Sequence, residues 1–207
     1  MSPRFTARPG HQAMAGRERC SAEFRVPGVF RSRRRAYFTG GMEVLRSVAL
    51  IAATMTMGLM AGVFALYANT IMPGLRRTDD RTFIGAFQSI DKAIVNPLFM
   101  AGFFGALLFT GLAAGLHLDA DSRPVLPWIA SAFVLYLAAV VITLAVNVPL
   151  NDRLKAAGSP DRIADLAAVR KRFNEARWSA WNAVRTLTST AAFGCLAWAL
   201  VVDGDLR

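Results

Sequence analysis

The chain has 207 residues, of which 54% are hydrophobic and 18% are charged, and its formal net charge is +10. Soluble domains have about 25% charged residues, so this composition argues against a soluble globular domain. An excess of basic residues also occurs in nucleic-acid-binding proteins, but here the basic residues flank long apolar runs, as they do at membrane anchors. We therefore predict membrane lipids as the surrounding partner and no nucleic acid.

The first 41 residues differ from the rest of the chain. They contain nine arginines, two acidic residues and no apolar periodicity, which predicts a disordered extension. The alternatives are a transit peptide and a translation start at Met42, with the preceding residues lying upstream of the true protein. In each case residues 42–207 form the membrane domain.

Four stretches without Lys, Arg, Asp or Glu follow. A membrane-spanning helix needs about 20 apolar residues, and all four stretches reach this length if the fourth helix begins at Trp181. Backbone polar groups in lipid must be satisfied within the segment, which favours helices. The sequence therefore predicts an all-α fold, a four-helix transmembrane bundle in the cell membrane, rather than the buried helices of a soluble protein. The predicted spans are residues 48–69, 97–118, 127–148 and 181–202.

The two long connections contain further helical patterns. Phenylalanine and isoleucine recur at helical spacing over residues 78–95, which predicts an amphipathic loop helix. Asn96 and Pro97 then have the residue types of an N-cap and a first helical position. After a Gly-Ser-Pro breaker in the second long connection, the pattern predicts one long fourth helix over residues 161–202.

A short motif occurs twice. Residues 72–75 follow the first span and residues 148–151 follow the third, and each segment has proline at its second position. This similarity indicates two related helix hairpins in parallel orientation. Chance similarity is the alternative.

The distribution of basic residues predicts the orientation in the membrane. The connections over residues 70–96 and 149–180 carry eleven Lys and Arg, whereas the opposite side carries three when counting starts at Met42. By the positive-inside rule, these two connections are then cytoplasmic. If residues 1–41 are included, the opposite side carries twelve, so the orientation depends on the start of the chain.

Polar and aromatic residues gather at the rim where spans one and three end and spans two and four begin. A guanidinium with several amides can bind a carbonyl, phenolate or quinone oxygen, and tryptophan can stack on a flat ring. Polar residues at membrane depth are costly and often face a bundle interior. The alternative is that Arg185 snorkels to lipid headgroups and the tryptophans form an interfacial belt. The rim residues are Asn69, Asn96, Asn147, Asn151, Trp178, Trp181, Asn182 and Arg185.

Other catalytic signatures are absent from the sequence. It contains no HExxH, Walker, GxSxG or CxxC motif, and its two cysteines and two histidines lack the spacing of a metal site. We therefore predict no metal and no cofactor. His117, at the opposite rim, is interpreted as an interfacial residue. Asp79 and Asp80 are interpreted as an acidic pair at a helix N-terminus.

Several of these segments resemble the anthrone oxygenase-like family, small four-span membrane proteins that are mostly bacterial and of unknown function. The resemblance covers about residues 44–202. It rests on the segments NTIMPGL (69–75), NP (96–97), NVPLN (147–151) and WSAWNAVR (178–185).

The resemblance implies an activity, because members so named oxidise anthrones to anthraquinones with molecular oxygen and no known cofactor. It also implies a shared motif of Asn147, Asn151, Trp181, Asn182 and Arg185. In the mechanism that it suggests, Arg185 stabilises the substrate enolate before oxygen attacks. The expected catalytic residues are Arg185, Asn182, Asn147 and Asn151, and the expected substrate-binding residues are Trp178, Trp181, Asn96 and Asn69.

Such a reaction also needs a general base, and Asp152 is the only carboxylate that we expect near the rim. The predicted function is thus a cofactor-free oxygenase of polycyclic phenolic or anthrone-type substrates, that is, of an aromatic small molecule. The alternative is a non-catalytic membrane protein that binds a lipid, quinone or protein partner at the same rim. A transporter is less favoured, because four spans offer little room for a pathway.

Overall fold

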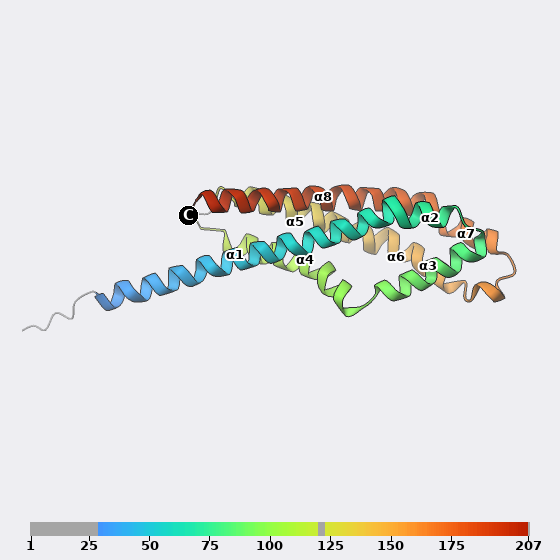
Figure 1. Ribbon diagram of the computed structural model, residues 1–207, viewed down its shortest axis with the longest axis horizontal. Helices are drawn as coiled ribbons and strands as arrows, with labels where there is room; N and C mark the ends of the chain where they lie inside the picture. The colour runs from blue at the N-terminus through green and yellow to red at the C-terminus, as the bar shows by residue number, and fades with distance from the viewer. Residues whose placement is uncertain (1–28, 120–122, 207) are drawn as a thin grey trace, which may run out of the picture. The chain divides into compact units, whose positions relative to one another are not determined.

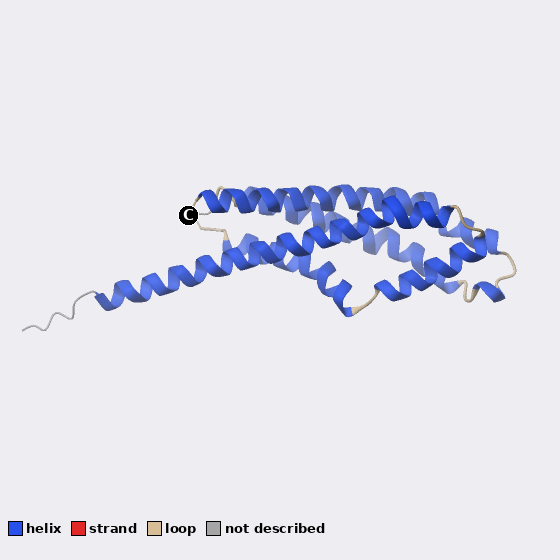
Figure 2. Ribbon diagram, in the orientation of Figure 1, coloured by secondary structure: helices blue, strands red, loops and turns tan. Residues whose placement is uncertain are grey.

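The computed structural model describes residues 29–119 and 123–206, and all the regular structure in these ranges is helical (Figure 2). The chain divides into two units, Met1–Phe38 and Thr39–Arg207. The second contains all the spans. The predicted extension over residues 1–41 lies mainly outside the described residues and stays a prediction.

Within residues 29–119 and 123–206, four helical segments are long and apolar enough to cross a membrane, which confirms the predicted four-helix transmembrane bundle. Many large apolar side chains are exposed along them, including Leu98 at 84% and Leu187 at 72%. Such exposure is expected where lipid is the solvent. The four segments are Gly41–Arg76, Pro97–Leu116, Leu126–Ala156 and Leu166–Asp205.

The spans are built from shorter elements in chain order (Figure 1). The first comprises the part of α1 (Val29–Leu66) from Gly41 onward, the π-helix η1 (Tyr67–Ile71) and α2 (Met72–Arg76); the second is α4 (Pro97–Leu116). The third comprises α5 (Leu126–Ile142), the π-helix η2 (Thr143–Asn147) and α6 (Val148–Ala156); the fourth comprises α7 (Leu166–Phe173) and α8 (Glu175–Asp205).

The bundle packs through small residues. Helix α5 packs along α8 and α4 packs along α5. Small side chains let membrane helices approach closely, and the Tyr136 hydroxyl adds a bond from α5 to α4 by donating to the Phe103 carbonyl at 3.0 Å. The buried alanines of the described bundle are Ala49, Ala53, Ala61, Ala106, Ala113, Ala132, Ala139, Ala192 and Ala199.

The repeated proline motif coincides with a repeated local structure. In the first span the N–H of Met72 bonds to the Tyr67 carbonyl five residues earlier, and in the third span the N–H of Val148 bonds to the Thr143 carbonyl in the same way. A proline follows each of these donors and has no N–H for an α-helical bond. The two π-helices therefore occupy equivalent places, as expected for related hairpins, and such widened turns often occur at functional sites.

The predicted loop helix is present as α3 (Asp80–Ile94). Asp79 caps it by accepting a bond from the Thr82 N–H at 3.1 Å. Hydrogen bonds from Thr82 hold the pKa of the Asp79 carboxyl below its ordinary value. The apolar face of α3 is buried against α6 and α7, which places this connection over one end of the bundle.

The predicted continuous helix over residues 161–202 is wrong in its first half. A short 3-10 turn (η3, Pro160–Arg162) precedes α7, and Asn174 separates α7 from α8 with a left-handed φ of 57°. Asparagine tolerates this conformation, and the Asn174 side chain caps α8 by accepting from the Arg177 N–H. Arg170 of α7 bonds to Asp80 and Glu175, which holds α7 beside α3. Helix α8 is still long, with 31 residues.

At the opposite end of the bundle, His117 is fully buried. Its Nδ1 lies 2.7 Å from the Ala113 carbonyl and its Nε2 lies 3.5 Å from a carboxylate oxygen of Asp203. Arg46 bonds to the Leu116 carbonyl and to Asp119 beside it. These contacts join the ends of α1, α4 and α8.

Asn96 caps α4, as its position before Pro97 predicts. Its Oδ1 accepts a bond from the Phe99 N–H at 3.0 Å, and its Nδ2 donates to the carbonyls of Ala93 and Ile94.

We expect Asn96→Ala to lower the free energy of unfolding by about 1 kcal/mol, because the first turn of α4 loses its cap. Asn96→Ser is the matched control, since serine caps almost as well. Thermal unfolding in detergent micelles measures both variants. Equal midpoints for the alanine variant and the wild type would contradict this assignment.

Candidate functional site

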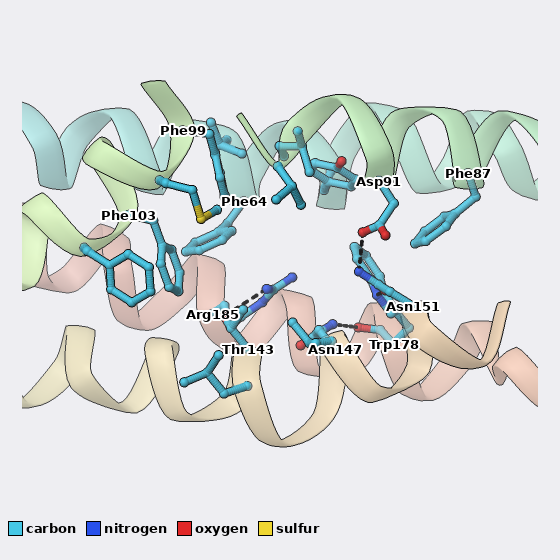
Figure 3. A pocket seen from close by; sticks show the side chains of 18 residues that line it. Phe64, Phe87, Asp91, Phe99, Phe103, Thr143, Asn147, Asn151, Trp178 and Arg185 are labelled. Atoms are coloured by element: carbon cyan, nitrogen blue, oxygen red, sulfur yellow. Dashed lines mark hydrogen bonds between the residues drawn. The ribbon is translucent and has the colours of Figure 1, made fainter. Parts of the chain in front are cut away.

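A cavity of about 240 Å³ lies at the predicted rim. Its walls come from all four spans and from α3 (Figure 3). The two π-helices contribute Tyr67, Thr143 and Asn147. The widened turns of spans one and three thus face the same space.

Seven of the eighteen residues that line the cavity are aromatic. The rings of Phe64, Phe87, Phe99, Phe103 and Trp178 line it. Phe87 and Trp178 meet edge to face with their centroids 5.7 Å apart. Ligand pockets usually measure about 300–1,000 Å³, so this smaller cavity suits a compact, flat molecule.

Arg185 is the only cation on the cavity wall within the described part of the chain, and it is 5% exposed. Its Nη1 donates to the Thr143 hydroxyl at 3.0 Å, and its Nη2 donates to the side-chain Oδ1 of Asn182 at 2.8 Å. Its Cζ lies 4.6 Å from the ring centroid of Phe64 and 5.5 Å from that of Trp178. The hydroxyl, the amide and the two rings around the guanidinium are all uncharged.

No carboxylate of residues 29–119 or 123–206 forms an ion pair with Arg185. Its Nε is also buried without a hydrogen-bond acceptor. A buried charge without a counter-ion is strongly unfavourable. An anionic or strongly polar oxygen in the cavity can supply the acceptor that this Nε lacks.

A second set of polar residues forms a chain of hydrogen bonds across the cavity wall. The Trp178 indole N–H donates to the side-chain Oδ1 of Asn151 at 2.7 Å, and the side-chain Nδ2 of Asn151 donates to the Asp91 carboxylate at 2.7 Å. Lys155 lies 3.2 Å from the other carboxylate oxygen and 2.8 Å from Asp152. Figure 3 shows Asp91 pointing from α3 toward Asn151.

Asn147 lies on the cavity wall, whereas Asn182 lies behind it. The side-chain Nδ2 of Asn147 donates to the Trp178 backbone carbonyl at 3.3 Å, while the side-chain Oδ1 of Asn147 is buried without a donor. Asn147 lines the cavity, so a ligand hydroxyl can supply the missing donor. Asn182 does not line it; its amide donates to the Phe64 carbonyl, and its oxygen holds Arg185.

Besides Asn182, three more of the predicted rim residues lie outside the cavity. Asn69 is exposed on η1, where the wider turn directs Tyr67 to the cavity instead. Asn96 is the cap of α4. Trp181 is 37% exposed, because the buried face of α8 runs through Trp178, Asn182 and Arg185 at helical spacing.

The carboxylate nearest the cavity is Asp91 and not Asp152. Asp91 is 7% exposed and lines the cavity, whereas the Asp152 side chain is 59% exposed and pairs with Lys155. The signal in the sequence was the four-residue spacing between Phe87 and Asp91, which puts both on the buried face of α3.

The exposed part of the cavity lining is apolar. Among the lining residues, those that are also exposed are Val95, Phe104, Leu144 and Val148. All four are apolar, and they belong to the α3–α4 connection, α4, η2 and α6. An apolar molecule can therefore enter the cavity between these elements.

These observations define a class: a four-helix membrane protein with an aromatic-lined cavity beside a buried arginine that has no carboxylate partner among the described residues. A family model described as anthrone oxygenase matches residues 91–195. The chain belongs to this family, and the predicted resemblance is confirmed. The matched range begins at Asp91 and includes Asn147, Asn151, Trp178 and Arg185. No curated protein and no solved structure matches the chain.

We expect Asn151→Leu to lower the free energy of unfolding by about 1–3 kcal/mol, because it leaves the Asp91 carboxylate and the Trp178 N–H without their partner. Asn69→Leu is the matched control, since Asn69 is exposed outside the cavity. Thermal unfolding in detergent measures both. Equal effects of the two substitutions would contradict a structural role for this hydrogen-bond chain.

Proposed function

We propose that the protein is a membrane-embedded oxygenase that converts an anthrone-type substrate to the corresponding quinone with molecular oxygen. The observation that carries this proposal is the buried guanidinium of Arg185, which lacks a carboxylate partner in the described part of the chain and borders an aromatic cavity. Membership in the anthrone oxygenase family supports the same reaction.

The substrate's chemistry suits this cavity. An anthrone is a flat tricyclic ketone whose carbonyl lies across the central ring from a methylene group. Removal of a methylene proton gives an enolate with its negative charge on the carbonyl oxygen. Arg185 stabilises this oxygen electrostatically, and such stabilisation is strongest in a water-poor site. The aromatic walls bind the ring faces.

The atoms of the reaction balance without a further reductant. The enolate carbon gives electrons to oxygen, and a carbon–oxygen bond forms to yield a hydroperoxide. Loss of the second proton from this carbon and cleavage of the O–O bond then produce the new carbonyl and water. In total, one CH₂ group and one O₂ become one C=O group and one H₂O.

Access from the membrane fits the same substrate class. Polycyclic ketones partition into hydrocarbon, and the exposed part of the cavity lining is apolar. Membrane lipids are thus the phase that supplies the substrate. The reaction needs no group beyond oxygen and the residues of the chain, in line with a cofactor-free oxygenase.

A second candidate function is non-catalytic binding of a quinone, quinol or lipid at the same rim. The unpaired carbonyl oxygen of Asn147 favours it, because this acceptor suits a phenolic or quinol hydroxyl. The two functions differ in one measurable way, since only the oxygenase consumes oxygen when the ligand is added.

We expect Arg185→Met to lower the rate of anthrone-dependent oxygen uptake about 10²–10³-fold, the usual cost of removing one oxyanion-stabilising group. Oxygen-electrode measurements on the protein in lipid vesicles test this, with protein-free vesicles giving the rate of autoxidation. Arg177→Met is the matched control, because Arg177 is exposed on the first turns of α8. Equal rates in wild type and Arg185→Met would refute the role of Arg185.

For the orientation, we propose that the cell membrane holds the protein with residues 70–96 and 149–180 in the cytoplasm. Their basic residues support this by the positive-inside rule. A reporter that is active only in the cytoplasm should be active when inserted after Gly158 and inactive when fused to the C-terminus. The reverse pattern would overturn the orientation.

A further inference from the structure

We propose that Asp91 is the residue that exchanges protons with the substrate, with Asn151, Trp178 and Lys155 positioning its carboxylate. This inference rests on the proposed oxygenase function and adds the base that the reaction requires.

The position of Asp91 carries the argument. It is the only carboxylate on the cavity wall among the described residues. It lies on α3, whereas Arg185 lies on α8, so the two charged groups approach the cavity from different elements (Figure 3). A substrate with its carbonyl oxygen at Arg185 can therefore direct another part of its ring system to Asp91.

The contacts of Asp91 keep its carboxylate in place without occupying all its acceptor sites. One oxygen accepts from the Asn151 amide at 2.7 Å, and the other lies 3.2 Å from Lys155 and has no hydrogen bond of good geometry. A carboxylate has about four lone-pair sites. Acceptor capacity thus remains for a substrate proton.

Lys155 is a positioning residue. Its ammonium group lies 3.2 Å from one carboxylate oxygen of Asp91 and is itself held by Asp152 at 2.8 Å. The side chain of Lys155 is 46% exposed, so this pair connects the buried carboxylate with the solvent-facing surface of α6.

Asp91 can perform every proton transfer in the reaction. It first takes a proton from the methylene carbon, and it returns this proton to the peroxide oxygen after the carbon–oxygen bond has formed. It then takes the second proton from the same carbon as the O–O bond breaks. It delivers this proton to the departing hydroxide, which leaves as water. Asp91 ends ionised, and no net proton enters or leaves.

The direct test is Asp91→Asn, which keeps the shape and one acceptor oxygen but removes the base. We expect anthrone-dependent oxygen uptake to fall about 10²–10⁴-fold, while quenching of tryptophan fluorescence by anthraquinone still shows binding. Asp161→Asn is the matched control, because Asp161 is an exposed carboxylate that pairs with Arg81 away from the cavity. It should retain the wild-type rate.

The positioning role has a separate readout. In Lys155→Met the kinetic profile of anthrone-dependent oxygen uptake should change, with a lower kcat and an unchanged KM, because the carboxylate loses a contact that holds it while the cavity wall keeps its lining residues. Lys155→Arg should restore the wild-type profile.

The outcomes separate the two proposals. Wild-type turnover with an inactive, ligand-binding Asp91→Asn variant supports Asp91 as the base. Wild-type turnover with an equally active Asp91→Asn variant overturns this inference and leaves the proposed function intact. No wild-type turnover above autoxidation overturns both. A Lys155→Met profile that matches wild type refutes the positioning role of Lys155.

Discussion

The site depends on a positive charge that is buried among neutral partners. The guanidinium of Arg185 has two hydrogen bonds, to Thr143 and Asn182, and two aromatic ring faces beside it. The hydrogen bonds to this charged group contribute about 1.5–3 kcal/mol each and the ring faces about 0.5–2 kcal/mol each, while burying an ion costs several kcal/mol. The Nε is still buried without an acceptor. An enolate or phenolate oxygen beside the guanidinium lowers its electrostatic free energy, so binding of a ligand and stabilisation of charge are the same physical event.

The rest of the bundle places groups around this charge. Pro73 and Pro149 interrupt the α-helical hydrogen bonds of spans one and three at equivalent points, and the π-helices η1 and η2 precede them. The widened turns bring a tyrosine, a threonine and an asparagine to one cavity. Asn174 has a related effect, because its left-handed backbone separates α7 from α8 and lets α7 pack beside α3. The loop helix then contributes Asp91 from outside the four spans.

The sequence predicts the spans well because lipid imposes a length and a polarity that can be counted. It also predicts the rim, since topology alone brings Asn147, Asn151, Trp178 and Arg185 to one end. It fails where a rotation within a helix decides the outcome. Asn69 and Trp181 have the right depth but the wrong face, and Asp152 lies only four residues from Ala156, the last residue of α6, and points to solvent. The continuous helix over 161–202 failed because asparagine adopts a left-handed conformation that composition does not reveal.

The central claim is that Arg185 stabilises an anionic oxygen in the cavity. The most direct measurement is the pH titration of a hydroxyanthraquinone bound to the protein in vesicles, because its phenol and phenolate absorb at different wavelengths. The account predicts that the wild type lowers the ionisation midpoint of the bound dye by about 1–3 pH units relative to protein-free vesicles, and that Arg185→Met abolishes this shift. The same midpoint in wild type, variant and protein-free vesicles would contradict the account.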